Sequence, residues 1–342
     1  TFQMTGSIFQ PLVGLYTDRH PKPYSLVLGM GATFCGLVLL ALAPRYEWIL
    51  VAAGVVGLGS AIFHPESSRM ARLASGGRHG FAQSVFQVGG NAGTSLGPLL
   101  AAWIIVPHGQ RYILVFTVLA LIGMILLSRV GNWYAAELAG RRTARLKAET
   151  ASGLPKKTIA RSMAVLLVLM FSKFFYLASM TNYYTFYLIQ KFGLSVQQSQ
   201  LYLFLFLFAV AAGTIAGGPV GDRIGRKLVI WISILGMSPF ALLLPHANLF
   251  WAAVLSMIVG FLMASAFPAI LVYATELLPG KVGLIAGLFF GLAFGMAGIG
   301  SAVLGKLADA TSIAFVVSVC AYLPLLGLFT GFLPNLKHPR SA

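Results

Sequence analysis

The segment Gly14-Leu-Tyr-Thr-Asp18-Arg19 returns in the second half of the chain as Gly218-Pro-Val-Gly-Asp222-Arg223. A second match lies at almost the same spacing, since Val56-Gly57 with Pro65 corresponds to Val259-Gly260 with Pro268. A constant offset over two separate segments is typical of an internal duplication. The sequence therefore predicts two related halves that run in the same direction.

The composition requires a lipid environment. Of 342 residues, 58% are hydrophobic and only 9% are charged, which is too little charge to cover the surface of a water-soluble fold. The net charge of +16 does not indicate nucleic acid, because nearly all the basic residues lie in alternate loops between apolar stretches. The two cysteines, Cys35 and Cys320, lie far apart within such stretches, so we expect no disulfide framework and no metal site.

Apolar stretches near the length that a bilayer requires recur along the chain, and in lipid they can satisfy their backbone only as helices. We place about eleven spans at 1–17, 24–43, 48–68, 80–106, 111–130, 162–189, 196–218, 227–245, 249–274, 281–305 and 312–333. Lys and Arg concentrate on one side of these spans, and the positive-inside rule makes that side cytoplasmic. The C-terminus is then cytoplasmic as well.

A basic linker over 131–161 divides the chain into an N-terminal bundle, 1–130, and a C-terminal bundle, 162–333, with a cytoplasmic tail at 334–342. The span at 162–189 has no counterpart in the first half. We therefore expect one more helix upstream of Thr1, which would complete two pseudo-symmetric six-helix bundles related by an axis along the membrane normal.

The repeated Gly-Asp-Arg segments resemble the cytoplasmic signature of the major facilitator superfamily, an all-α membrane fold. Glycine lets a neighbouring helix approach closely, and a carboxylate with a guanidinium at a helix end can form a charge-assisted pair that holds two helices in one state. The alternative is ordinary charge that only sets the topology. The expected latch residues are Gly14, Asp18 and Arg19, and then Gly218, Asp222, Arg223 and Arg226.

The span at 80–106 contains a second signature. Its Gly93, Gly97 and Pro98 resemble the fifth-helix element of drug/proton antiporters in that superfamily. Proline removes a backbone hydrogen bond and bends the helix, while the two glycines form a packing face. The alternative is an unspecific proline kink.

The same span places Gln83, Gln87, Asn91 and Ser95 on one helical face. Such a polar stripe faces a water-filled cavity rather than lipid, which makes its first three members candidates for substrate binding. Each of them could equally form hydrogen bonds between helices.

Three ionisable residues within predicted spans are candidates for a functional role. Lys173 has the apolar neighbours Phe171, Phe174 and Phe175 and no local counter-ion, so we expect it to bind an anionic substrate in a cavity, unpaired by any carboxylate. Glu66 and His64 are candidates for the proton carrier. Their alternatives are an ion pair between Glu66 and Arg69 or Arg72, and a packing or capping role for His64.

Tyrosines follow Lys173 at helical spacing, and an aromatic ring with a hydroxyl suits a cavity wall. We assign Tyr176 and Tyr183 to the substrate site. Tyr184 and Tyr187 also fit an aromatic belt near the outer interface.

Three further segments resemble the fosmidomycin-resistance branch of the superfamily, and the resemblance covers essentially the whole chain. They are His64-Pro65-Glu66-Ser67-Ser68-Arg69, Gly77-Arg78-His79-Gly80 and Phe86-Gln87-Val88-Gly89-Gly90-Asn91. The resemblance implies a bacterial inner-membrane exporter, driven by proton entry, that removes an anionic phosphonate. The chain departs from the wider antiporter pattern at Ala53, where an Arg is usual.

These patterns together predict a proton-coupled exporter of a small anion that works by alternating access. The expected partners are the substrate, protons and the lipid bilayer, with a monomeric chain, no cofactor and no nucleic acid. An uptake symporter for a small organic anion shares the fold and the latch. No constellation typical of an enzyme is found, and a channel that stays continuous would have no use for the repeated latch.

Overall fold

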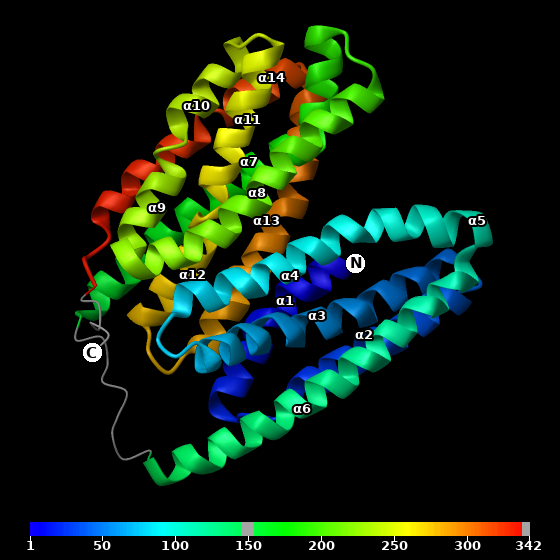
Figure 1. Ribbon diagram of the computed structural model, residues 1–342, viewed down its shortest axis with the longest axis vertical. Coiled ribbons are helices and arrows are strands. Elements are labelled where there is room, and N and C mark those ends of the chain that lie inside the picture. Colours follow the sequence, from blue (N-terminus) through cyan, green and yellow to red (C-terminus); the bar gives the residue numbers. More distant parts are fainter. Residues whose placement is uncertain (145–153, 337–342) are drawn as a thin grey trace. The chain divides into compact units, whose positions relative to one another are not determined.

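The computed structural model describes residues 1–144 and 154–336, in which all regular structure is helical. In chain order the elements are α1 (Phe2–Arg19), α2 (Ser25–Leu42), α3 (Tyr46–Ala74), α4 (His79–Leu100), η1 (Ala101–Ile105), α5 (Val106–His108), η2 (Gln110–Leu114), α6 (Val115–Ala144), α7 (Lys156–Phe192), α8 (Val196–Ile224), α9 (Arg226–Ile234), α10 (Ser238–Leu243), η3 (Leu244–His246), α11 (Leu249–Ala264), α12 (Ala266–Leu277), α13 (Val282–Ala310), α14 (Ile313–Cys320) and η4 (Leu323–Phe332) (Figure 1).

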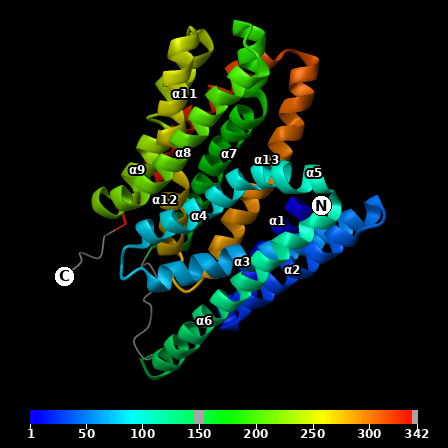
Figure 2. The same cartoon turned by 45° about the vertical axis from the view of Figure 1, so that its right-hand side comes forward.

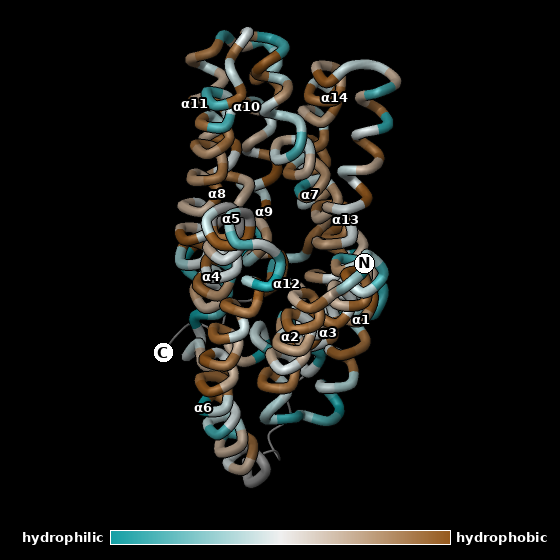
Figure 3. Tube along the Cα trace, turned by 90° about the vertical axis from the view of Figure 1, so that its right-hand side faces the viewer, coloured by the Kyte–Doolittle hydropathy of each residue, from teal (hydrophilic) through white to brown (hydrophobic). Residues whose placement is uncertain are grey.

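Many of these helices suit a bilayer. Within the described residues, 9 helical stretches are long and apolar enough to cross a membrane. Hydrophobic residues follow the helices, and hydrophilic residues gather at several turns (Figure 3). The prediction of a helical multi-pass membrane protein is confirmed, whereas the count of eleven spans and a further helix upstream stay predictions.

The chain forms two compact units. Unit 1 comprises residues 1–74, 89–153 and 278–295, and unit 2 comprises residues 75–88, 154–277 and 296–342. These units differ from the halves expected at 1–130 and 162–333, because each unit takes a short segment from the other half. The segments are the first turns of α4 in unit 2 and the first part of α13 in unit 1.

In unit 1, α3 packs against both α1 and α2, and α2 also packs against α6 (Figure 2). Glycines make these contacts close. A Cβ at Gly59 of α3 would lie 2.6 Å from the backbone oxygen of Gly29 in α2, and a Cβ at Gly57 would lie 2.8 Å from the oxygen of Phe2. Close packing through small residues is how helices associate where no water drives them together.

Unit 2 is built around α7, which contacts α8, α12, α14 and η4. Its core includes Tyr184, Phe206 and Met237, all fully buried. The helix α8 begins with a reciprocal capping box between Ser195 and Gln198 and ends at Gly225, whose φ of 100° closes the helix before α9 starts.

The region predicted as a linker, 131–161, is largely helical where it is described. The helix α6 continues to Ala144 and α7 already begins at Lys156. Arg and Lys favour helix in this stretch, so both helices extend beyond their apolar parts. Residues 145–153 and 337–342 lie outside the described part, and with them most of the predicted tail.

Candidate functional site

Asp18, at the end of α1, holds the start of α13 within unit 1. Its Oδ1 accepts a hydrogen bond from the backbone N–H of Gly283 at 2.8 Å, and its Oδ2 accepts one from Leu284, also at 2.8 Å. These amides belong to the first turn of α13, which has no partners for them within the helix. A carboxylate at that position satisfies the amides and interacts favourably with the positive end of the helix dipole.

Arg69 of α3 completes this contact. Its guanidinium donates to Asp18 Oδ1 at 2.7 Å, and it also binds the backbone oxygen and the hydroxyl of Thr17. On its other side Arg69 forms an ion pair with Glu66 at 3.1 Å, and Glu66 in turn accepts a hydrogen bond from Ser25 at 2.9 Å. Glu66 is completely buried, with an exposed fraction of 0%. The chain of contacts therefore runs from α2 through α3 and α1 to α13.

Unit 2 repeats this arrangement with Asp222 of α8. Its two carboxylate oxygens accept hydrogen bonds from the backbone N–H groups of Gly80 and Phe81, each at 2.9 Å, in the first turn of α4. Arg226 donates to Asp222 at 3.0 Å and forms an ion pair with Glu276 of α12 at 3.3 Å.

The glycines of the repeated segment lie where the helices cross. A Cβ at Gly14 would lie 2.0 Å from the backbone oxygen of Gly283, and a Cβ at Gly218 would lie 2.3 Å from that of Gly80. Each latch therefore joins a Gly and an Asp from one sequence half to the first turn of a helix from the other half. The structure brings Gly14 and Asp18 together with Gly283, and Gly218, Asp222 and Arg226 together with Gly80.

Arg19 and Arg223, which directly follow the two aspartates, are both exposed. The guanidinium that binds each aspartate comes instead from Arg69 and Arg226. An Arg one residue after the Asp points to another face of the helix, whereas Arg226 reaches Asp222 from the start of α9, beyond the turn at Gly225.

His64 lies in unit 1, in α3, one helical turn before Ser68. Its Nδ1 is 3.0 Å from the backbone oxygen of Ser60, and its ring packs against Phe290 and Phe294 of α13, with centroids 5.1 Å away in each case. The imidazole therefore touches the helix that Asp18 holds.

Lys173 is buried in α7, with an exposed fraction of 5%. Its ammonium lies 5.4 Å from the ring centroid of Phe174 and 5.3 Å from that of Phe267 in α12. Among the residues that the structure describes, it forms no ion pair with a carboxylate. Contacts with aromatic faces offset only part of the cost of removing an ammonium from water.

The tyrosines after Lys173 face the core of unit 2. Tyr176 is buried there, and Tyr183 donates a hydrogen bond to the backbone oxygen of Ser301 at 2.8 Å. Tyr184 and Tyr187 are buried as well and bind the backbone oxygens of Ala252 and Pro245.

The polar stripe of α4 changes in burial along its length. Gln83 is buried, Gln87 is half-buried and Asn91 is exposed, while the side chain of Ser95 lies outside the described part. Nε2 of Gln87 is buried without a hydrogen-bond partner among the described residues.

The antiporter element of α4 is open on its glycine face. A Cβ at Gly93 or at Gly97 would meet no described atom within 4 Å, so the expected packing face has no neighbour among the described residues. The side chain of Pro98 is outside the described part. After it the helix widens into the π-helical turn η1, Ala101–Ile105, which is consistent with a local break in the α-helical hydrogen bonding.

Sequence reasoning missed the pairs Asp18–Arg69 and Arg226–Glu276. Their members are far apart in the chain, and no local pattern connects them.

No group of acidic, His and Cys side chains suited to a metal occurs in residues 1–144 and 154–336.

Comparison with known proteins gives consistent results. The model of the Major Facilitator Superfamily matches residues 1–195 and again residues 165–342. The chain is 58% identical to the fosmidomycin resistance protein of Escherichia coli, over 99% of this chain and 83% of that protein. It is 40% identical to the uncharacterised MFS-type transporter YfnC of Bacillus subtilis, over 99% of this chain and 84% of the relative. The crystal structure of the Escherichia coli fucose:proton symporter superposes with a TM-score of 0.74 at 13% identity, covering 97% of this chain and 89% of that structure.

Proposed function

Because this chain belongs to the major facilitator superfamily, we propose that it exports a small anionic drug, a phosphonate such as fosmidomycin, in exchange for protons. The observation that carries the proposal is the 58% identity, over nearly the whole chain, with a protein named for fosmidomycin resistance. The membrane is the bacterial inner membrane, and the basic loops and the C-terminus face the cytoplasm.

Lys173 is the proposed partner of the anion. An ammonium at the centre of a span costs roughly 2.5–3.5 kcal/mol even on the lenient insertion scale. The two phenylalanine rings around it leave the charge without a counter-ion among the described residues. A phosphonate would supply that missing charge when it binds.

Neutral polar side chains complete the proposed substrate site. They are Gln83, Gln87, Asn91, Tyr176 and Tyr183. Support comes from Gln87, whose buried Nε2 donors have no described acceptor and could bind a phosphonate oxygen. Hydroxyl groups of tyrosine could do the same.

Glu66 and His64 are the proposed proton carriers, and their surroundings suggest how a proton could act. Arg69 bridges the carboxylates of Glu66 and Asp18. Protonation of Glu66 would remove one of the two charges that hold this guanidinium, and so would alter the latch that Asp18 forms with α13. His64 also contacts α13, through Phe290 and Phe294.

The two latches favour one state of an alternating-access cycle. Each joins helices from different sequence halves, so each must open if those halves move apart at this end. The chain is proposed to work as a monomer in the bilayer, without a cofactor.

The test uses everted membrane vesicles that contain the full chain, in which export appears as uptake. Acidifying the vesicle lumen should drive accumulation of labelled fosmidomycin, and a protonophore should abolish it. Accumulation of fosmidomycin that does not depend on the pH gradient would contradict proton coupling. Loss of vesicle drug under the same gradient would favour the alternative, an uptake symporter for a small organic anion.

A further inference from the structure

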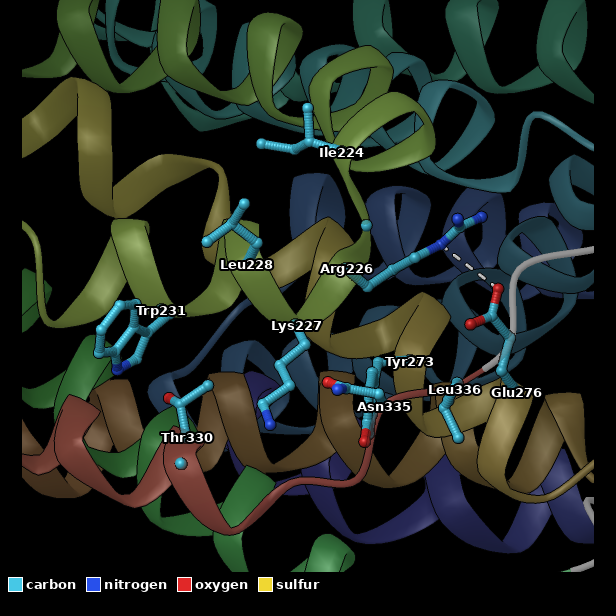
Figure 4. A pocket seen from close by; sticks show the side chains of 12 residues that line it. Ile224, Arg226, Lys227, Leu228, Trp231, Tyr273, Glu276, Thr330, Asn335 and Leu336 are labelled. Atoms are coloured by element: carbon cyan, nitrogen blue, oxygen red, sulfur yellow. Dashed lines mark ion pairs between the residues drawn. The ribbon is translucent and has the colours of Figure 1, made fainter. Parts of the chain in front are cut away.

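A cavity of about 490 Å³ opens in unit 2, where α8 ends and α9 begins. Its walls come from the α8–α9 turn, the first turns of α9, the last turns of α12, and the end of η4 with the segment that follows it (Figure 4). The substrate and proton residues discussed above do not line it, and it shares only Arg226 with the latch. Its ligand is therefore unassigned.

The cavity contains one cation that the latch does not use. Arg226 is bound to both Asp222 and Glu276, and neither carboxylate forms an ion pair with Lys227 in the described part of the chain. Lys227 forms no ion pair or side-chain hydrogen bond with any described residue, and it extends into the hollow between Thr330 and Asn335 (Figure 4). A free ammonium in a cavity attracts an anion.

A buried hydroxyl also lines the cavity. Thr330 has an exposed fraction of 0%, and its Oγ1 has no hydrogen-bond partner within the described chain. Buried hydroxyls are rarely left unpaired, because their desolvation is then uncompensated. The first turn of α9 is a second source of donors, because no side chain caps it.

One wall of the cavity is apolar and exposed at the protein surface. Trp231, with an exposed fraction of 46%, lies with Leu228 and Ile224 along the wall, and all three are exposed large hydrophobic residues. Lys227 lies at the first turn of a stretch, Arg226–His246, that is long and apolar enough to span the membrane. Tryptophan and lysine at a span end are typical of the level of the lipid headgroups.

We propose that this cavity binds an anionic phospholipid of the leaflet on the side of the basic loops. The phosphate diester binds Lys227, the hydroxyl of Thr330 and the first turn of α9, and an acyl chain lies along Leu228 and Trp231. A soluble phosphate ester would share the polar contacts, but the exposed apolar wall favours the lipid. The site does not depend on the proposed drug or on proton coupling.

The experiment measures tryptophan quenching in the full chain, reconstituted in phosphatidylcholine nanodiscs that contain increasing amounts of brominated phosphatidylglycerol. Brominated phosphatidylcholine serves as the reference lipid. The signal of Trp231 is isolated by subtracting the quenching of Trp231→Phe. We expect Trp231 to be quenched at a lower mole fraction by the anionic lipid. Equal quenching by both lipids would overturn the proposal.

Two lysine variants test where the phosphate of the lipid binds. Lys227→Gln should weaken the apparent affinity for phosphatidylglycerol about fivefold, as expected for one basic residue near an anionic surface. Lys22→Gln is the matched control, because Lys22 is an exposed lysine in a basic loop of unit 1. This variant should leave the affinity for phosphatidylglycerol unchanged. Equal effects of both variants would show that the lipid responds to general surface charge, and would contradict a defined site in the cavity.

Thr330→Val separates binding from folding. Valine has nearly the same shape and removes an unpaired buried hydroxyl, so a merely structural threonine would give an equally stable protein with unchanged lipid affinity. We expect an equally stable protein with weaker affinity. Glycerol 3-phosphate is the soluble competitor. If it displaces the lipid at micromolar concentration, the site takes a soluble phosphate ester and the assignment to a lipid is wrong.

Discussion

The two latches and the positive charge in the cavity each depend on single residues. Some of these residues could be identified from the sequence, and others could not. The repeat made Gly14, Asp18, Gly218 and Asp222 stand out, because it preserved both residue types in both copies. The donors that bind the two aspartates could not be found in this way. A backbone N–H at the start of another helix has no side-chain signature, and Arg69 lies 51 residues from Asp18 in the chain.

Substitution of Lys173 tests the proposed anion site. Lys173→Met should abolish fosmidomycin export while the protein stays folded and inserted, because methionine keeps the apolar bulk and removes the charge. Lys173→Arg should retain part of the activity, since the charge survives with altered geometry. Drug resistance of cells and the amount of protein in the membrane are both measured.

Lys306→Met is the control for this series, because Lys306 is exposed in unit 2. It should keep full resistance. Full resistance in Lys173→Met as well would remove Lys173 from the substrate site.

Neutralising Asp222 tests the latch. Asp222→Asn keeps one acceptor oxygen for the α4 amides but loses the charge-assisted pair with Arg226. We expect resistance to fall several-fold while substrate affinity in a static binding assay changes less than twofold, because the variant shifts the balance between states. Arg223→Gln, at an exposed neighbour, should behave like the wild type. Wild-type resistance in Asp222→Asn would leave that residue only a role in topology.

At the scale of elements, the apolar stretches correctly predicted helices, because lipid leaves the backbone no other choice. The ends of helices were less predictable. The linker expected at 131–161 contains helix up to Ala144 and again from Lys156, since polar helix formers continue a helix beyond its apolar part. The packing of α1 on α13 could not be predicted, because it depends on how the halves meet.

Glycines on α13 provide a test of that packing. Gly283, Gly287 and Gly291 lie one helical turn apart, and a Cβ at Gly287 would lie 2.2 Å from the backbone oxygen of Gln10 in α1. Gly287→Ala should therefore lower the Tm of the purified protein by several degrees, despite the roughly 0.5–1 kcal/mol by which alanine favours a helix over glycine.

Gly93→Ala is the opposite case. No described atom lies within 4 Å of the added Cβ, so the helix preference of alanine should leave the Tm unchanged or raise it slightly. Equal losses in both variants would show that the close approach of α1 and α13 is not what Gly287 provides. A larger loss in Gly93→Ala would support the packing face expected from the antiporter signature.

At the scale of the whole molecule, the chain is a duplicated helical transporter whose fold does not decide the direction of transport. The family model matches the chain twice, as expected for related halves. The superposition with the fucose:proton symporter shows a shared fold, and a shared fold does not distinguish export from uptake. Substrate and direction could not be predicted from helices and latches, because both depend on which state binds which ligand more tightly.

The most direct test of the central claim measures proton movement that is driven by the drug alone. The full chain is reconstituted in proteoliposomes that are loaded with fosmidomycin and a pH-sensitive dye, and then diluted into drug-free buffer of the same pH. As drug leaves, exchange for protons should acidify the lumen whichever way the protein is inserted, and Lys173→Met should abolish the signal. Alkalinisation of the lumen, which indicates symport, or drug efflux without a change in pH would contradict the account.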